Sequence, residues 1–167
     1  MVAITGEGNC EVYLLNNLIE RGCLIFSKKD ILDRKVLHLR QPKMIAPVVN
    51  TLPIQEEITF YRVGDTQRDE FDLSCFGQSR KERITIKKIC TKPEIEILII
   101  INEGLYTEYL KVSSSVSPKE FVKNKVKKYT SFNDYIDSHD MVSSIKEYKR
   151  LKKHEKDELY LADLLKE

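Results

Sequence analysis

Two apolar runs, each followed by a glycine and an acidic residue, constrain the fold of this chain most. Residues 1–6 form the first run and are followed by Glu7. Leucines and isoleucines then recur at three- and four-residue spacing, which predicts a β-strand, a glycine turn and an α-helix over Asn9–Arg21. The β-branched and aromatic run Ile58–Val63 leads through a glycine to Asp65 and predicts a second strand of the same kind.

The acidic residues after these two strands are candidate metal ligands. In an open α/β sheet, ligands bind at the carboxyl ends of the strands. Hard divalent cations such as Mg²⁺ prefer carboxylate oxygens, so Glu7 and Asp65 could share one ion at this edge. The structural alternatives are an ordinary turn residue for Asp65 and an acid that complements a helix dipole for Glu7.

The order of these motifs resembles the TOPRIM nuclease family, and more closely its small OLD-like branch, which is associated with bacterial phage defence. A strand and a Glu-Gly-x-x-Glu motif open that family, and they stand here as the first apolar run and Glu7–Glu11. The family's apolar strand with an acidic cluster corresponds to residues 63–69, and its later helix start corresponds to residues 92–98. The resemblance covers roughly the first two thirds of the chain. It departs from the family at Gln67, where the second aspartate of Asp-x-Asp is usual.

The resemblance implies a Rossmann-like, mostly parallel sheet flanked by helices and a Mg²⁺- or Mn²⁺-dependent endonuclease. Such a hydrolase cleaves phosphodiesters of DNA or RNA, here with Glu7 and Asp65 as catalytic residues and metal ligands. Glu11 is implied as a further ligand, Asp69 is the candidate to replace the acid missing at position 67 (Asp72 is another), and a late lysine, Lys123, is implied to stabilise phosphoryl charge.

The departure at Gln67 also leaves a second interpretation open. The chain would then be a catalytically weak or inactive TOPRIM-like module that binds nucleic acid or a separate ATPase subunit. OLD-like proteins often pair this fold with an ATPase, and residues 1–167 contain no P-loop motif of their own. A homodimer is compatible with either interpretation.

The segment before residue 102 has two structural interpretations. Thr91–Glu94 has the form of a capping box and predicts a helix over Ile95–Asn102, yet the same apolar run is typical of a buried strand. The family resemblance favours the helix. Glu96 interrupts the run, and burying a carboxylate without a partner is costly. It is therefore either a further metal ligand or the partner of a basic residue.

Two basic clusters are candidates for contact with a nucleic-acid backbone, although solvated surface is the ordinary explanation for either. The cluster around the predicted strand Ile84–Cys90 contains Arg80, Lys81, Arg83, Lys87 and Lys88. In the second cluster, Lys119, Lys123 and Lys127 recur every four residues and would share one face of a helix. The formal net charge of +2 is small, so any basic surface must be local.

The chain of 167 residues is expected to form a single domain, with an α/β core over residues 1–112 and an all-helical extension over residues 113–167. Within the core, Cys23–Phe26 is a plausible second strand and residues 43–52 a short helix. A capping box at Ser117 predicts a helix start, and residues 137–153 and 157–165 are also expected to be helical.

The sequence also indicates where the protein works. No stretch approaches the roughly 20 apolar residues that cross a bilayer, and the N-terminal run lacks the basic flank of a signal peptide. We therefore expect a cytoplasmic protein without contact to a membrane. The four cysteines lack CxxC spacing, which argues against a structural zinc site.

Overall fold

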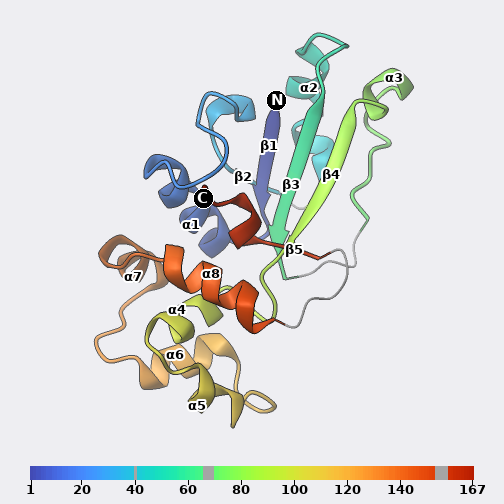
Figure 1. The fold of residues 1–167 in the computed structure, drawn as a ribbon. Coiled ribbons are helices and arrows are strands. Elements are labelled where there is room, and N and C mark those ends of the chain that lie inside the picture. Colours follow the sequence, from blue (N-terminus) through green and yellow to red (C-terminus); the bar gives the residue numbers. More distant parts are fainter. Residues whose placement is uncertain (40, 66–69, 153–157) are drawn as a thin grey trace.

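A parallel β-sheet forms the centre of the molecule (Figure 1). The computed structural model describes residues 1–39, 41–65, 70–152 and 158–167. Within these residues the strand order is β2-β1-β3-β4-β5, and all neighbouring strands are parallel. The strands are β1 (Val2–Gly6), β2 (Leu37–His38), β3 (Ile58–Gly64), β4 (Ile84–Cys90) and β5 (Leu159–Tyr160). The expected α/β architecture with a parallel sheet is therefore confirmed.

The register of the two central strands determines where the acidic residues lie. Gly6 of β1 is opposite Val63 of β3, so Glu7 and Gly64 follow at the same edge of the sheet. Both strands are largely buried, because each face of the sheet is covered, as is usual for parallel strands. The two apolar runs identified in the sequence thus become neighbours.

Helices surround this sheet and extend beyond its carboxyl edge. Their bounds are α1 (Asn9–Glu20), α2 (Ala46–Thr51), α3 (Gln78–Lys81), α4 (Ile97–Asn102), α5 (Tyr106–Leu110), α6 (Pro118–Lys125), α7 (Phe132–Ser138) and α8 (Val142–Leu151), with 3₁₀ turns η1 (Leu32–Arg34), η2 (Pro42–Met44) and η3 (Leu161–Leu164). In Figure 1 the strands point downward, and α4, α5 and α6 lie below their carboxyl ends. No helix in the described part of the chain is both long and apolar enough to span a membrane.

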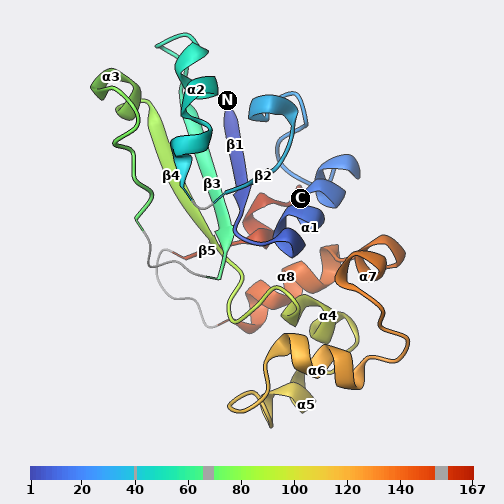
Figure 2. The same ribbon diagram turned by 180° about the vertical axis from the view of Figure 1, so that it is seen from behind.

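The sheet separates two apolar cores. One contains Ile4, Tyr61 and Ile89 together with α1, α4 and α8. The other contains Phe60, Phe71 and residues of α2, which covers the face of the sheet seen in Figure 2. This second core is smaller, and Arg62 lies at its edge with its guanidinium 5.0 Å from the centre of the Phe71 ring.

Several local predictions are confirmed. The 43–52 segment forms η2 and α2, and the ambiguous 95–102 run is helical, although α4 begins at Ile97. Ser117 caps α6, with its Oγ accepting a hydrogen bond from the Glu120 amide at 3.3 Å. The predicted capping box at Thr91 does not form. The Thr91 hydroxyl is buried and has no hydrogen-bond partner among the described residues, because the chain turns again before the helix starts.

The second strand and the C-terminal segment differ from their predictions. Leu24 makes only an isolated bridge with Leu165, and Leu37–His38 provides β2 instead. The predicted 137–153 helix is divided into α7 and α8, because the backbone of His139 is extended. The C-terminal third is not all-helical: Leu159–Tyr160 joins the sheet beside β4, and 3₁₀ turn η3 follows.

Candidate metal centre

The predicted catalytic acids lie at the carboxyl edge of the sheet. Glu7 follows β1 and Asp65 follows β3, and the Glu7 amide donates to the Val63 carbonyl at 3.0 Å. Because β1 and β3 are adjacent and in register, the two acidic positions are close in space. Adjacent strand ends at this edge are where the sequence predicted that the two acids would lie.

An acidic pocket of about 370 Å³ opens beside Asp65. Three further carboxylates line it: Glu11 in the first turn of α1, and Glu94 and Glu96 before α4. Lys119 in the first turn of α6 is the basic side chain among the described residues that line it. The pocket therefore carries a strong excess of negative charge.

Burial and mutual repulsion act on the carboxylates of the acidic pocket. Glu11 is 8% exposed and Glu96 is 7% exposed. Burial raises the pKa of Glu11, and the charges of Glu96, Asp65 and Glu7 raise it further. Burial likewise raises the pKa of Glu96, with the charge of Glu94 adding to the effect and that of Lys119 opposing it. Both groups are thus held in surroundings that penalise their ionised forms.

These shifts predict that Glu11→Gln stabilises the metal-free protein at neutral pH. Folded Glu11 retains its proton to higher pH than unfolded Glu11, so stability is lost as pH rises above the ordinary glutamate pKa of about 4.3. Glutamine carries no charge and avoids this loss. We expect a gain of about 1 kcal/mol at pH 7, or about 2–4 °C in Tm for a chain of this size, which disappears below pH 4.

Thermal unfolding in EDTA at several pH values measures this gain. The matched control is Glu57→Gln, because Glu57 is an exposed glutamate whose side chain forms only a surface ion pair with Arg83 at the amino end of β3. A Tm of Glu11→Gln at or below that of the wild type at pH 7 would contradict the electrostatic account of the acidic pocket.

Glu7 precedes Gly8, which lines the acidic pocket, and forms a buried ion pair. Its Oε1 lies 3.3 Å from an Nη of Arg62, and the two side chains are 9% and 3% exposed. The carboxylate rests directly on Gly64, where an added Cβ would lie 2.3 Å from the Glu7 carboxyl carbon. Glycine at this position is what lets Glu7 occupy the space above the end of β3. The Glu7 carboxylate is therefore fixed over the end of β3 by Arg62 on one side and by Gly64 on the other.

The donor atoms of the acidic pocket suit a hard divalent cation. All of its acidic ligand candidates offer carboxylate oxygens, and the repulsion among them is what a cation would relieve. Within the described residues no group of three or more His, Cys, Asp or Glu is spaced to hold an ion. Glu11 or Glu96 would have to rotate toward Asp65, or Asp69 would have to contribute; Asp69 lies outside the described residues, as does Gln67.

Lys119 occupies the place that the sequence suggested for Lys123. It lines the pocket, whereas Lys123 is exposed one turn further along α6. The Lys119 amide also donates to Glu94 Oε2 at 3.1 Å, which ties the start of α6 to the segment before α4. Glu94, expected to cap its own helix, thus caps another one. The predicted shared helical face of Lys119, Lys123 and Lys127 does not extend to Lys127, because α6 ends at Lys125.

The basic cluster around β4 is divided between the two ends of the sheet. The prediction that Arg80 contacts nucleic acid is wrong. Arg80 is 3% exposed, and its guanidinium donates to the carbonyls of Leu52, Pro53 and Glu56. Lys81 in α3 and Arg83 before β4 lie at the amino edge, away from the acids. Lys87 and Lys88 are exposed on β4, and Lys88 is in register with Arg62.

His38 was not expected from the sequence to lie near the site, whereas Cys10 was placed in the loop of the predicted site. His38 ends β2, and its Nε2 lies 3.2 Å from the Glu7 carbonyl oxygen. No sequence signal marks it, because the second strand was placed elsewhere. Cys10 lines the acidic pocket, and burial together with Glu96 and Glu11 raises its pKa to about 11. The Cys10 side chain is therefore a protonated thiol at neutral pH.

Comparison of the chain with protein-family models, with curated proteins and with solved structures finds no match.

Proposed function

We propose that this chain is a Mg²⁺- or Mn²⁺-dependent nuclease of the TOPRIM, OLD-like type. The observation that carries the proposal is the acidic pocket at the carboxyl edge of the sheet. Glu7 and Asp65 follow neighbouring parallel strands there, and Glu11 and Glu96 converge on the same place from two different helical segments. Ligand sites of open α/β sheets lie at this edge.

The residues divide into ligands and supporting groups. Glu11, Asp65 and Glu96 would hold the cation, and Arg62 would hold Glu7 beside them. When bound, the cation supplies Lewis-acid stabilisation of the phosphoryl oxygens and lowers the pKa of water. Lys119, at the wall of the pocket, supplies a positive charge for the phosphate. Burial and neighbouring carboxylates raise the pKa of Glu11 and Glu96, and a bound cation would favour their ionised forms.

Cleavage of labelled single-stranded and plasmid substrates by the purified protein tests this proposal. We expect phosphodiester cleavage in Mg²⁺ or Mn²⁺ and none in EDTA, with DNA and RNA strands assayed side by side. Glu57→Gln, far from the pocket, should cleave like the wild type. Folded protein that cleaves neither substrate in either metal would exclude the nuclease.

A non-catalytic TOPRIM-like module is the second candidate. It is favoured by the ion pair that engages Glu7 with Arg62 and by the spacing of the acids, no three of which surround a common point within the described residues. Such a module would act by binding nucleic acid or a partner ATPase. Binding of a nucleic-acid strand without cleavage in Mg²⁺ or Mn²⁺ would support this candidate over the nuclease.

A further inference from the structure

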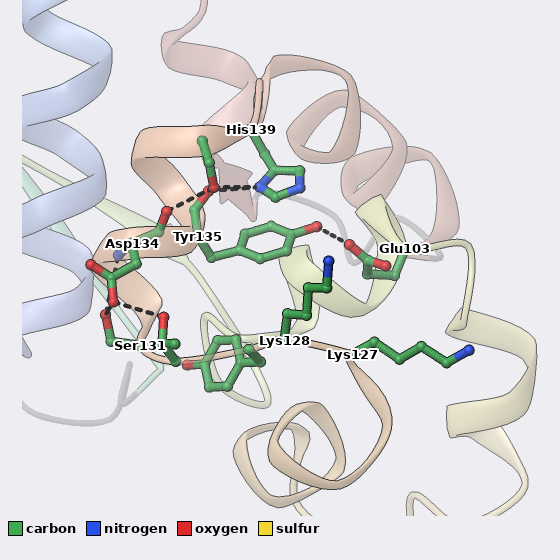
Figure 3. Close-up of a pocket in the computed structure, with 10 residues that line it drawn as sticks. Glu103, Lys127, Lys128, Ser131, Asp134, Tyr135 and His139 are labelled. Carbon is green, nitrogen blue, oxygen red and sulfur yellow. Dashed lines mark hydrogen bonds between the residues drawn. The ribbon is translucent and has the colours of Figure 1, made fainter.

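A second pocket, here called the aromatic pocket, lies between the end of α4, the α6–α7 loop and α7 (Figure 3). Its volume is about 310 Å³, at the lower end of the range of roughly 300–1,000 Å³ that small-molecule sites span. The side chains that define its character are those of Glu103, Lys128, Tyr129, Ser131, Tyr135 and His139. Its size suits one small ligand group, not a length of polymer.

A rigid aromatic wall forms one side of this pocket. The rings of Tyr135 and His139 are stacked with centroids 3.9 Å apart and an interplanar angle of 7°. The Tyr135 hydroxyl donates to Glu103 Oε1 at 2.6 Å and accepts from Asn102 Nδ2 at 2.8 Å. Figure 3 shows the Tyr135 hydroxyl directed at Glu103 from the stacked pair. Burial and the bond to Glu103 also raise the pKa of Tyr135, so its hydroxyl stays a donor.

The charges around the aromatic pocket balance. Lys127 and Lys128 provide two positive charges, and Glu103 and Asp134 two negative ones. Asp134 Oδ2 already accepts hydrogen bonds from Ser131 and Thr130. A pocket without net charge has no strong electrostatic attraction for a simple anion. Rings together with both donors and acceptors suit a flat heteroaromatic group that stacks and forms hydrogen bonds.

The aromatic pocket adjoins the acidic pocket. Tyr129 lines the first, and it lies near enough to Glu96 of the second that the charge of Glu96 adds to the effect of burial in raising the pKa of Tyr129. The helix α7 is also tied to α1, because the Tyr13 hydroxyl donates to Asp137 at 2.7 Å and Arg21 pairs with Asp140 just beyond α7 at 3.0 Å. Since α1 carries Cys10 and Glu11, the two pockets are held together.

We propose that the aromatic pocket seats one unpaired nucleobase of the strand whose phosphate lies at the acidic pocket. The substrate is then single-stranded or locally unpaired nucleic acid. Bases in a duplex are stacked and paired and cannot enter such a pocket without being extruded. The base packs against the aromatic rings, while Lys127 and Lys128 neutralise the flanking phosphates at the rim. This inference rests on the proposed function in one respect, since it takes nucleic acid as the substrate.

Equilibrium binding of short fluorescein-labelled strands tests the inference without requiring cleavage. Three probes of equal length are compared by fluorescence anisotropy in Ca²⁺ and in EDTA: a single strand, the same strand with every base removed, and the duplex. Base–aromatic stacking is worth about 1–3 kcal/mol, so the intact single strand should bind about 5- to 150-fold more tightly than the abasic strand. Equal binding of the intact and abasic strands, or tighter binding of the duplex, would overturn the inference.

Two variant pairs locate the effect in the aromatic pocket. Tyr129→Ala should remove most of the preference for bases, whereas Tyr129→Phe should retain it because the ring remains. Lys128→Gln should weaken binding of every strand, while Lys29→Gln should not, since Lys29 is exposed near the amino end of β1. If Tyr129→Ala and Tyr129→Phe both keep the wild-type preference for the intact strand over the abasic strand, the placement of the base in this pocket is overturned.

The outcome also separates this inference from the nuclease proposal. Base-dependent binding that requires Tyr129, without cleavage in Mg²⁺ or Mn²⁺, would support the aromatic pocket and exclude the nuclease. Metal-dependent cleavage by a protein that binds intact and abasic strands equally would support the nuclease and overturn the aromatic pocket as a base site.

Discussion

Asp65→Asn should reduce metal-dependent cleavage by about 100-fold or more, because a metal ion contributes several kcal/mol of charge stabilisation and each ~1.4 kcal/mol is a factor of ten in rate. Asp65 is exposed at the end of β3 and lines the acidic pocket, so asparagine preserves its size and removes its charge. The fold should be unaffected, since an exposed substitution rarely changes stability by more than about 0.5 kcal/mol. The loss should therefore lie in the rate and not in the amount of folded protein.

Initial rates in Mg²⁺ and in Mn²⁺ measure this loss, with thermal unfolding as the check on folding. Glu57→Gln is again the matched control. The cleavage rate of Glu96→Gln should be reduced as that of Asp65→Asn is, because both carboxylates line the same pocket. Unchanged cleavage by Asp65→Asn would place the catalytic centre elsewhere on the protein.

Arg62→Leu should destabilise the protein by about 3–5 kcal/mol, because it removes one member of the buried Arg62–Glu7 ion pair. For a chain of this size each 1 kcal/mol shifts Tm by about 2–4 °C, so the melting temperature should fall by roughly 6–20 °C. The guanidinium also contacts the Phe71 ring, and that contact is lost as well. Urea unfolding measures the difference directly.

A comparison of two ion pairs gives this prediction its control. Arg83 and Glu57 form an exposed pair at 3.5 Å, with exposed fractions of 48% and 82%, and such a pair contributes about 0–1 kcal/mol. Arg83→Leu should therefore be nearly neutral. The double variant Glu7→Gln/Arg62→Leu should recover part of the stability lost in Arg62→Leu, because both charges of the pair are then removed. Equal effects of Arg62→Leu and Arg83→Leu would show that the Glu7 pair is not structurally important.

The parts of the site that the sequence predicted depend on local patterns. The strand, glycine turn and helix at Glu7 and the strand before Asp65 are each encoded within about ten residues, and parallel pairing then brings their ends together. Glu96 was marked by its position inside an apolar run, and it is buried in the acidic pocket. Local patterns were therefore sufficient to place Glu7, Asp65 and Glu96 near the carboxyl edge of the sheet.

The parts that the sequence did not predict depend on contacts between distant segments. The C-terminal leucines suggested a helix, but Leu159–Tyr160 pairs with β4 and Tyr160 packs edge-to-face on Tyr148. Arg80 resembled its exposed neighbours in charge, yet it fixes three carbonyls of a preceding loop. The bond between Glu94 and the Lys119 amide joins segments 25 residues apart. No short-range pattern carries information of that kind.

The most direct test of the central claim is the titration of the purified protein with Mn²⁺, followed by electron paramagnetic resonance of the free ion. We predict that the wild type and Glu57→Gln remove Mn²⁺ from solution and that Mg²⁺ displaces it, whereas Glu11→Gln, Asp65→Asn and Glu96→Gln bind it at least about tenfold more weakly. Mn²⁺ binding that is unchanged in these three variants, or absent from the folded wild type, would contradict the assignment of the acidic pocket as a metal centre.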